Sequence, residues 1–240
     1  MKISLLKRIS SFVVACFIVM SASSCNEKIR ETDTDQLALP KVGEEIAVMH
    51  TSAGDIYFRL FPEDAPKAVE NFIYHAQKDN YNGVKVFRSE PNYLIQTGDY
   101  ENNDGTGGKS KWGNGFRVEL SSSLHHIRGA LGMARGENRN SQGSQFYVIT
   151  RAYVSVAYSE ELKETNPELA KKYEENGGIP ELDGDYTVFG QAFAGFAALD
   201  ELNKGNTSDE SDDTEDVYIL GVEIVKYAEG LIPDSAFSNK

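Results

Sequence analysis

The residue types with the clearest chemical potential lie within residues 86–100. Arg88 follows one short apolar run, and Gln96 follows a second apolar run that contains Tyr93 and Leu94. Arginine and glutamine side chains both hydrogen-bond to amides, and arginine stays protonated at neutral pH. The segment has no activated nucleophile and no cluster of metal ligands, which is unusual for a hydrolase. This set of residues suits a site that binds a peptide and redistributes its electrons.

A glycine-rich loop follows Gln96, and its GTGGKS sequence at 105–110 resembles part of a phosphate-binding loop. That motif requires G-x-x-x-x-G-K-[ST], and Asn103 occupies the position of the first glycine. The next residues, 112–115, are typical of a turn and do not begin a helix. We therefore reject nucleotide binding and expect the glycines to let the backbone approach another chain or a ligand closely.

Two further groups of polar residues could suggest metal binding. His125 and His126 are adjacent, but no third ligand stands at a metal-like spacing, so a polar turn is the favoured interpretation. Six acidic residues crowd 209–216, and a calcium site is the functional alternative. The spacing of a calcium loop and its central glycine are missing, so we favour a solvated connector there.

The elements that position these residues are mainly strands. Apolar and polar residues alternate around a turn at 52–55, which predicts a β-hairpin over 45–61. A helix begins at 64–66, and its apolar residues recur at helical spacing. The two-residue period places Gln145 and Tyr147 on one face of a strand. Further strands are predicted at 84–86, 93–95, 116–120, 129–135, 143–150, 186–189 and 217–227.

Residues 151–180 differ in composition, being rich in Glu, Lys and Tyr. An N-cap and a proline predict a helix over 167–176, with a weaker helix before it. Residues 192–202 also have a helical pattern of small residues. Many short strands with a few helices indicate a mainly β domain, a barrel or sandwich with helices at its ends.

Composition limits the possible partners. The 240 residues include 40% hydrophobic residues, enough for a packed core. The formal net charge is −13, which would repel the phosphates of nucleic acids, so we expect no nucleic-acid partner. Both cysteines precede residue 26, so the domain that follows has no disulfide or thiol chemistry.

The N-terminal residues resemble a bacterial lipoprotein signal. Basic residues precede an apolar stretch at 9–20 that is too short to span a bilayer, and small residues then lead to Cys25. We expect a signal peptide at 1–24, lipidation of Cys25 and a flexible tether over 25–44. Cys16 and an ordinary secretory signal are the alternatives. A lipid-anchored domain in the bacterial cell envelope, periplasmic or surface-exposed, follows from the favoured interpretation.

Six short blocks of the remaining sequence, taken together and in order, resemble a known pattern. They are AVENF at 68–72, FRSEPNYLIQTGD at 87–99, GTGGKS at 105–110, ALGMAR at 130–135, NSQGSQFYVIT at 140–150 and VFGQAFAG at 188–195. These blocks and their order resemble those of cyclophilin-type peptidyl-prolyl isomerases, over about 46–227 apart from the charged insertion. GTGGKS matches the glycine loop of that family throughout.

The resemblance implies an eight-stranded antiparallel barrel capped by two helices, occupying 45–230, with 151–180 as an extra helical insertion and 231–240 as a tail. It implies that Arg88 is the catalytic arginine and that Gln96 binds the substrate carbonyl. By the same resemblance the substrate-binding residues are Tyr93, Leu94, Ala134, Arg135, Gln145, Tyr147, Leu182 and Tyr186.

The sequence departs from the family pattern at several of these positions. Tyr147 replaces a phenylalanine, and Tyr186 stands where many members have a histidine. Glu181 falls near the position at which the family has a tryptophan at the rim of the pocket. A carboxylate at this position should weaken the binding of cyclosporin-type inhibitors. Glu90 lies two residues from Arg88, on the same face of a strand, and could pair with it.

The resemblance implies a prolyl isomerase that needs no cofactor or metal and acts as a monomer on proline-containing polypeptides, assisting the folding of exported proteins. The alternative is a non-catalytic chaperone or scaffold that keeps the barrel and uses the insertion as a docking surface. Arg88, Gln96 and the aromatic pocket favour the enzyme.

Overall fold

The computed structural model describes residues 28–204 and 216–238. Within these residues, nine strands form one sheet in the order β4-β11-β2-β3-β10-β8-β9-β6-β5. The two edge strands, β4 (Val84–Lys85) and β5 (Arg88–Glu90), are neighbours in the chain, so the sheet must curl until its edges meet. The hydroxyl of Thr97 on β6 donates to the carbonyl of Lys85 on β4 at 2.9 Å, across the meeting point.

The observed elements are mainly short strands. The other strands of the curled sheet are β2 (Glu45–Thr51), β3 (Gly54–Leu60), β6 (Leu94–Thr97), β8 (Ala130–Met133), β9 (Phe146–Ile149), β10 (Val188–Ala194) and β11 (Tyr218–Lys226). The described helices are α1 (Pro66–Gln77), α2 (Val156–Thr165), α3 (Pro167–Asn176) and α4 (Phe196–Leu202), with 3-10 turns η1 (Pro180–Leu182) and η2 (Asp234–Phe237). A separate parallel pair joins β1 (Ile29–Arg30) to β7 (Leu120–Ser121).

The core lies inside the curled sheet. In the hairpin of β2 and β3, alternate residues such as Met49 and Phe58 point into the main apolar cluster, while Ile46 and Tyr57 join a second cluster on the outer face. Helices α1 and α4 both contribute to the main cluster, through residues such as Phe72 and Leu199. A mainly β, curled antiparallel sheet with helical caps is therefore confirmed, and in the described residues this sheet has nine strands instead of the expected eight.

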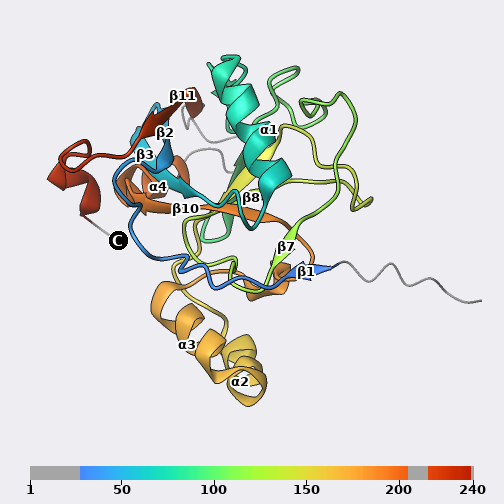
Figure 1. Ribbon diagram of the computed structural model, residues 1–240, viewed down its shortest axis with the longest axis vertical. Coiled ribbons are helices and arrows are strands. Elements are labelled where there is room, and N and C mark those ends of the chain that lie inside the picture. Colours follow the sequence, from blue (N-terminus) through green and yellow to red (C-terminus); the bar gives the residue numbers. More distant parts are fainter. Residues whose placement is uncertain (1–27, 205–215, 239–240) are drawn as a thin grey trace, which may run out of the picture.

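The insertion forms two helices that pack on each other at the opposite end of the molecule from α1 (Figure 1). Helix α3 has the bounds that the sequence predicts, because Asn166 caps its first turn and Gly177, at φ +68°, ends it. The weaker helix predicted before it is α2, capped by Ser155.

Two predicted elements are wrong over part of their length. Residues 116–119 do not form a strand: Phe116 makes a single bridge to Gln142 and Val118 donates to the carbonyl of Arg139, both in a loop, and only Leu120 belongs to a strand, β7, where it pairs with β1. Residues 192–194 belong to β10, where Ala192 and Ala194 pair with β3, and helix α4 begins only after Gly195. Pairing in the sheet overrides the helical pattern of small residues there.

Residues 28–44 lie against the barrel, so the predicted flexible tether needs correction for this segment. The side chain of Gln36 is 1% exposed. Its amide donates to the carbonyl of His125 at 2.8 Å and to the side chain of Gln191 at 3.0 Å. Thr32 and Thr34 donate to the carboxylate of Asp64. Buried polar contacts of this kind fix a segment that composition alone suggests is loose.

Several predictions concern residues outside the described part: the signal peptide at 1–24, Cys25 and most of the acidic connector at 209–216. None of the helices in 28–204 and 216–238 is long and apolar enough to cross a membrane.

Helix α1 buries a titratable side chain, His75, which is 1% exposed beside the ring of Tyr100. Burial lowers the pKa of His75 to about 4 from its ordinary value of 6.5. The unfolded chain therefore takes up this proton first as the pH falls below 6.5. We predict that the free energy of unfolding decreases between pH 6.5 and about 4 by roughly 2 kcal/mol from this group.

Urea unfolding across this pH range measures the effect. His75→Gln should flatten the pH dependence in this window, and the same change at the more exposed His50 serves as a control for replacing a histidine. An unchanged slope in His75→Gln would contradict the assignment.

Candidate functional site

The register of four adjacent strands brings the predicted catalytic residues into one row. Arg88 on β5 lies opposite Gln96 on β6, Gln96 lies opposite Tyr147 on β9, and Tyr147 lies opposite Gly132 on β8. Residues that are directly opposite each other in a sheet point to the same face. Arg88, Gln96 and Tyr147 therefore share one face of the sheet.

The same face carries an apolar cluster beside the row. Leu94 and Tyr147 are buried within it at 4% exposure each, and the ring of Tyr186 meets that of Tyr147 edge-on at 6.1 Å. Partly buried residues complete it: Tyr93, Ala134, Leu182 and Tyr186. All the apolar residues predicted to line the pocket are thus brought together. Ile95 and Val148, the alternate residues of the same strands, face the barrel core instead.

The guanidinium of Arg88 binds two groups. Its Nη1 donates to the side-chain oxygen of Gln96 at 3.2 Å. Its Nε and Nη2 donate to the carboxylate of Glu90 at 2.8 and 2.5 Å. The pairing of Glu90 with Arg88 that the strand period predicts is thereby confirmed. Both side chains are about half exposed, so the ion pair is accessible to water and salt.

Gln145 orients Gln96. The amide nitrogen of Gln96 donates to Oε1 of Gln145 at 3.0 Å, and Nε2 of Gln145 donates to the carbonyls of Gly105 and Gly107 at 2.9 and 2.7 Å. Because Arg88 donates to the oxygen of Gln96, contacts at both ends fix which way this amide points.

The glycine loop folds around the buried carboxylate of Asp99. That carboxylate accepts backbone N–H groups from Asn102, Gly105 and Gly107 at 2.9 to 3.0 Å. Burial raises the pKa of Asp99, but these hydrogen bonds outweigh it and hold the pKa below its usual value. A Cβ at Gly107 would lie 2.6 Å from this carboxylate. The expectation that the glycines allow close approach of another chain or ligand is therefore corrected for Gly107, which approaches its own chain.

A cavity of about 250 Å³ lies between the row and the glycine loop. Its lining includes Gln96, Ala134, Arg135 and Gln145. A larger cavity of about 470 Å³ lies between residues 34–45 and the start of α1, and none of the predicted site residues lines it. The smaller one is the cavity that adjoins the candidate chemistry.

Arg135 lies between this cavity and the apolar cluster. Its guanidinium stacks over the ring of Tyr186 at 4.3 Å and donates to the carboxylate of Asp185 at 2.6 Å. The backbone N–H of Ala134 donates to the carbonyl of Gln145 at 3.1 Å, within the sheet. Arg135 therefore holds the turn that carries Tyr186 against the site.

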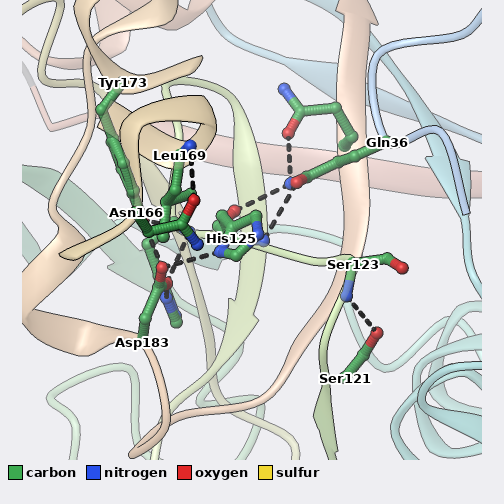
Figure 2. A network of polar contacts seen from close by, with 10 residues as sticks. Gln36, Ser121, Ser123, His125, Asn166, Leu169, Tyr173 and Asp183 are labelled. Atoms are coloured by element: carbon green, nitrogen blue, oxygen red, sulfur yellow. Dashed lines mark hydrogen bonds and ion pairs between the residues drawn. The ribbon is translucent and has the colours of Figure 1, made fainter. Parts of the chain in front are cut away.

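Sequence reasoning missed a polar cluster behind the apolar one. Asp183, just after η1, accepts from the hydroxyl of Tyr173 at 2.7 Å and contacts Nδ1 of His125 at 2.9 Å and Nδ1 of His126 at 2.7 Å. Figure 2 shows Asp183 and Gln36 on opposite sides of His125. Nε2 of His126 lies 2.9 Å from the hydroxyl of Tyr147.

The carboxylate of Asp183 is strongly stabilised in this cluster. Burial raises its pKa, but hydrogen bonds from His125 and His126 outweigh that effect and hold the pKa well below its usual value. The histidines and Asp183 are too far apart in the chain for any local spacing to reveal the cluster. Within the described residues, no group of three or more His, Cys, Asp or Glu side chains is placed to hold a metal ion.

Comparisons with known proteins found a matching family model and similar proteins. The family model for cyclophilin type peptidyl-prolyl cis-trans isomerases matches residues 46–224. A Staphylococcus haemolyticus protein that carries the name of a peptidyl-prolyl cis-trans isomerase is 37% identical over 193 residues, covering 77% of this chain and 96% of that protein. A Staphylococcus aureus protein of the same name is 36% identical over 184 residues, covering 76% and 92%.

A solved structure is also similar. The cyclophilin type peptidyl-prolyl cis-trans isomerase of Cryptosporidium parvum, crystallised in the presence of the dipeptide Ala-Pro, superposes with a TM-score of 0.61 at 26% identity. The superposition covers 76% of this chain and 99% of that one.

Proposed function

The chain belongs to the cyclophilin family of peptidyl-prolyl cis-trans isomerases, and we propose that Arg88 and Gln96 perform its reaction on the sheet face described above. The reaction is rotation about the peptide bond that precedes proline. Partial double-bond character gives that rotation a barrier of about 18–20 kcal/mol. Without a catalyst the exchange takes on the order of tens to hundreds of seconds.

Arg88 is suited to weaken the C–N resonance of this bond. In the twisted state the prolyl nitrogen becomes pyramidal and carries a lone pair, which a cationic N–H donor stabilises. A guanidinium has five N–H donors in a fixed plane, and the contacts to Glu90 and Gln96 use three of them. The remaining donors can reach toward a bound peptide while these contacts hold the plane.

Gln96 is suited to hold the carbonyl that precedes proline. Its amide nitrogen has two N–H donors, and one of them goes to Gln145. The second can donate to a substrate carbonyl, while the proline ring lies on the apolar cluster of Tyr93, Leu94, Tyr147, Leu182 and Tyr186. Catalysis then comes from tighter binding of the twisted state, with no covalent step and no cofactor.

The observation that carries this proposal is the cross-strand pairing of Arg88 with Gln96 beside an apolar cluster. The proline-containing polypeptide is proposed as substrate because the similar structure was crystallised in the presence of Ala-Pro. The non-catalytic scaffold remains the competing function.

We predict that Arg88→Ala lowers the catalysed cis-to-trans rate on an Ala-Pro-Phe peptide by about a hundredfold or more, because the donor to the prolyl nitrogen is lost. The protein used should begin at residue 26, since residues 28–44 pack on the barrel. Arg30→Ala, at a partly exposed arginine on β1, is the matched control. A folded wild type that does not exceed the spontaneous rate would exclude the enzyme and favour the scaffold.

We predict that Glu90→Gln raises kcat/KM by up to about fivefold at low salt. The carboxylate lowers the positive potential that Arg88 presents, and an exposed pair contributes about 0–1 kcal/mol. Salt should reduce the difference between the two proteins, because screening weakens the pair in the wild type. The control is Glu63→Gln, at an exposed carboxylate beside the larger cavity. A lower rate in Glu90→Gln would mean that Glu90 instead positions Arg88.

We propose further that the protein is exported, is anchored through a lipid on Cys25 and assists the folding of other exported proteins as a monomer in the bacterial cell envelope. The basic residues before an apolar stretch, followed by small residues and Cys25, support this. Residues 28–44 lie on the barrel, so little chain would separate the lipid from the domain.

We predict that Cys25→Ser abolishes incorporation of a labelled fatty acid in a bacterial host and releases the protein from the membrane fraction. Cys16→Ser should leave labelling unchanged. Labelling that persists in Cys25→Ser would exclude Cys25, and loss in Cys16→Ser would favour the earlier cysteine.

A further inference from the structure

The wall of the apolar cluster contains a tyrosine whose hydroxyl is buried. Tyr147 is 4% exposed, and its hydroxyl oxygen lies 2.9 Å from Nε2 of His126, which is itself 1% exposed. The two rings are nearly parallel, with their centroids 6.0 Å apart. A buried hydroxyl without a partner is costly, so His126 determines how this tyrosine can be accommodated.

The contacts of His126 fix where its proton lies. Its Nδ1 is 2.7 Å from an oxygen of Asp183. An ionised carboxylate can only accept, so Nδ1 carries a proton, and in the neutral ring Nε2 keeps its lone pair. The hydroxyl of Tyr147 then donates to Nε2. The result is an ordered chain of hydrogen bonds from Tyr147 through His126 to Asp183.

Several contacts hold Asp183 in place, so that it can orient this series of hydrogen bonds. It accepts the backbone N–H of His126 at 2.9 Å and the hydroxyl of Tyr173 from the insertion at 2.7 Å, and it contacts Nδ1 of His125 at 2.9 Å. Asp183 also lies next to Leu182 in the chain, on the same turn that carries Tyr186. Fixing this carboxylate therefore also fixes two residues of the apolar cluster.

A glycine on the neighbouring strand leaves room for the ring of Tyr147 in this position. Gly132 faces Tyr147 across β8 and β9. A Cβ at this glycine would lie 2.4 Å from Cζ and 2.6 Å from the hydroxyl oxygen of Tyr147. Real Cβ atoms do not approach other atoms so closely, so only glycine leaves room for this orientation of the tyrosine.

We propose that His126 and Asp183 are positioning residues of the isomerase site, which hold Tyr147 through its hydroxyl and thereby shape the surface that receives the substrate's proline. This inference rests on the proposed function. The helical insertion takes part, because Tyr173 on α3 donates to Asp183. The charged and titratable groups that face these hydrogen-bonded residues include His125, Tyr173, Lys172, Tyr93, Tyr186 and Arg135, which stacks over Tyr186.

The test is a double-mutant cycle of His126→Asn and Tyr147→Phe. The asparagine can still donate to Asp183 but is too short to reach Tyr147, and the phenylalanine removes only the hydroxyl. Because the contact positions the pocket and does not act on the reacting bond, each single variant should raise KM about three- to tenfold with kcat within about twofold. The double variant should be no worse than the poorer single variant.

A spectroscopic measurement is independent of activity. Nitrogen-15 NMR of the histidines should show a proton on Nδ1 of His126 in the wild type. Tyr147→Phe should shift the Nε2 resonance of His126, which loses its donor, and leave Nδ1 protonated. Circular dichroism and thermal unfolding of each variant establish that it is folded.

The outcomes separate this inference from the proposed function. If the wild type is active but the effects of the two substitutions on KM multiply independently, this inference alone is overturned. The same holds if neither substitution changes KM. An Nε2-protonated His126 would also overturn it. A folded wild type without isomerase activity would overturn the proposed function and this inference with it.

Discussion

The register of β5, β6, β9 and β8 is the constraint on which the rest of the site depends. Because side chains alternate between the faces of a strand, this register places Arg88, Gln96 and Tyr147 on one face and Ile95 and Val148 on the other. A slip by one residue would exchange the two sets, burying the arginine and exposing the core. The packing of the barrel interior therefore also fixes the position of the polar groups.

Polar contacts between segments far apart in the chain then hold the site in place. Gln145 joins Gln96 to the glycine loop, which folds around Asp99. Asp183 joins the wall of the pocket to the insertion through Tyr173. Gln145 and Asp183 are each partly buried and bind several groups. Such hydrogen-bond networks favour a single arrangement of the groups that they join.

The N-terminal segment 28–44 and the insertion 151–180 differ from the barrel in composition, but both contact the residues behind the site. Gln36, in the N-terminal segment, binds the carbonyl of His125, the neighbour of His126. Tyr173, in the insertion, binds Asp183 from the other side. The apolar cluster is therefore connected, through His126 and Asp183, to both the N-terminal segment and the insertion.

The sequence by itself determined the elements whose signals are local. The helix at 167–176 followed from its cap and its glycine, and the hairpin at 45–61 followed from alternation and a turn. The ordered blocks from AVENF to VFGQAFAG identified the family and the mainly β fold, and the strand period alone indicated the pairing of Glu90 with Arg88. Each of these signals arises between residues close together in the chain, or from the order of such segments.

Only the tertiary structure decided the features that depend on distant partners. Residues 192–194 are strand because they pair with β3, and 116–119 are not because only a loop lies beside them. The docking of 28–44 and the contacts of His126 with Asp183 and Tyr147 join segments separated by 21 to 155 residues. No local pattern encodes such contacts, because they form only when folding brings both partners out of water together.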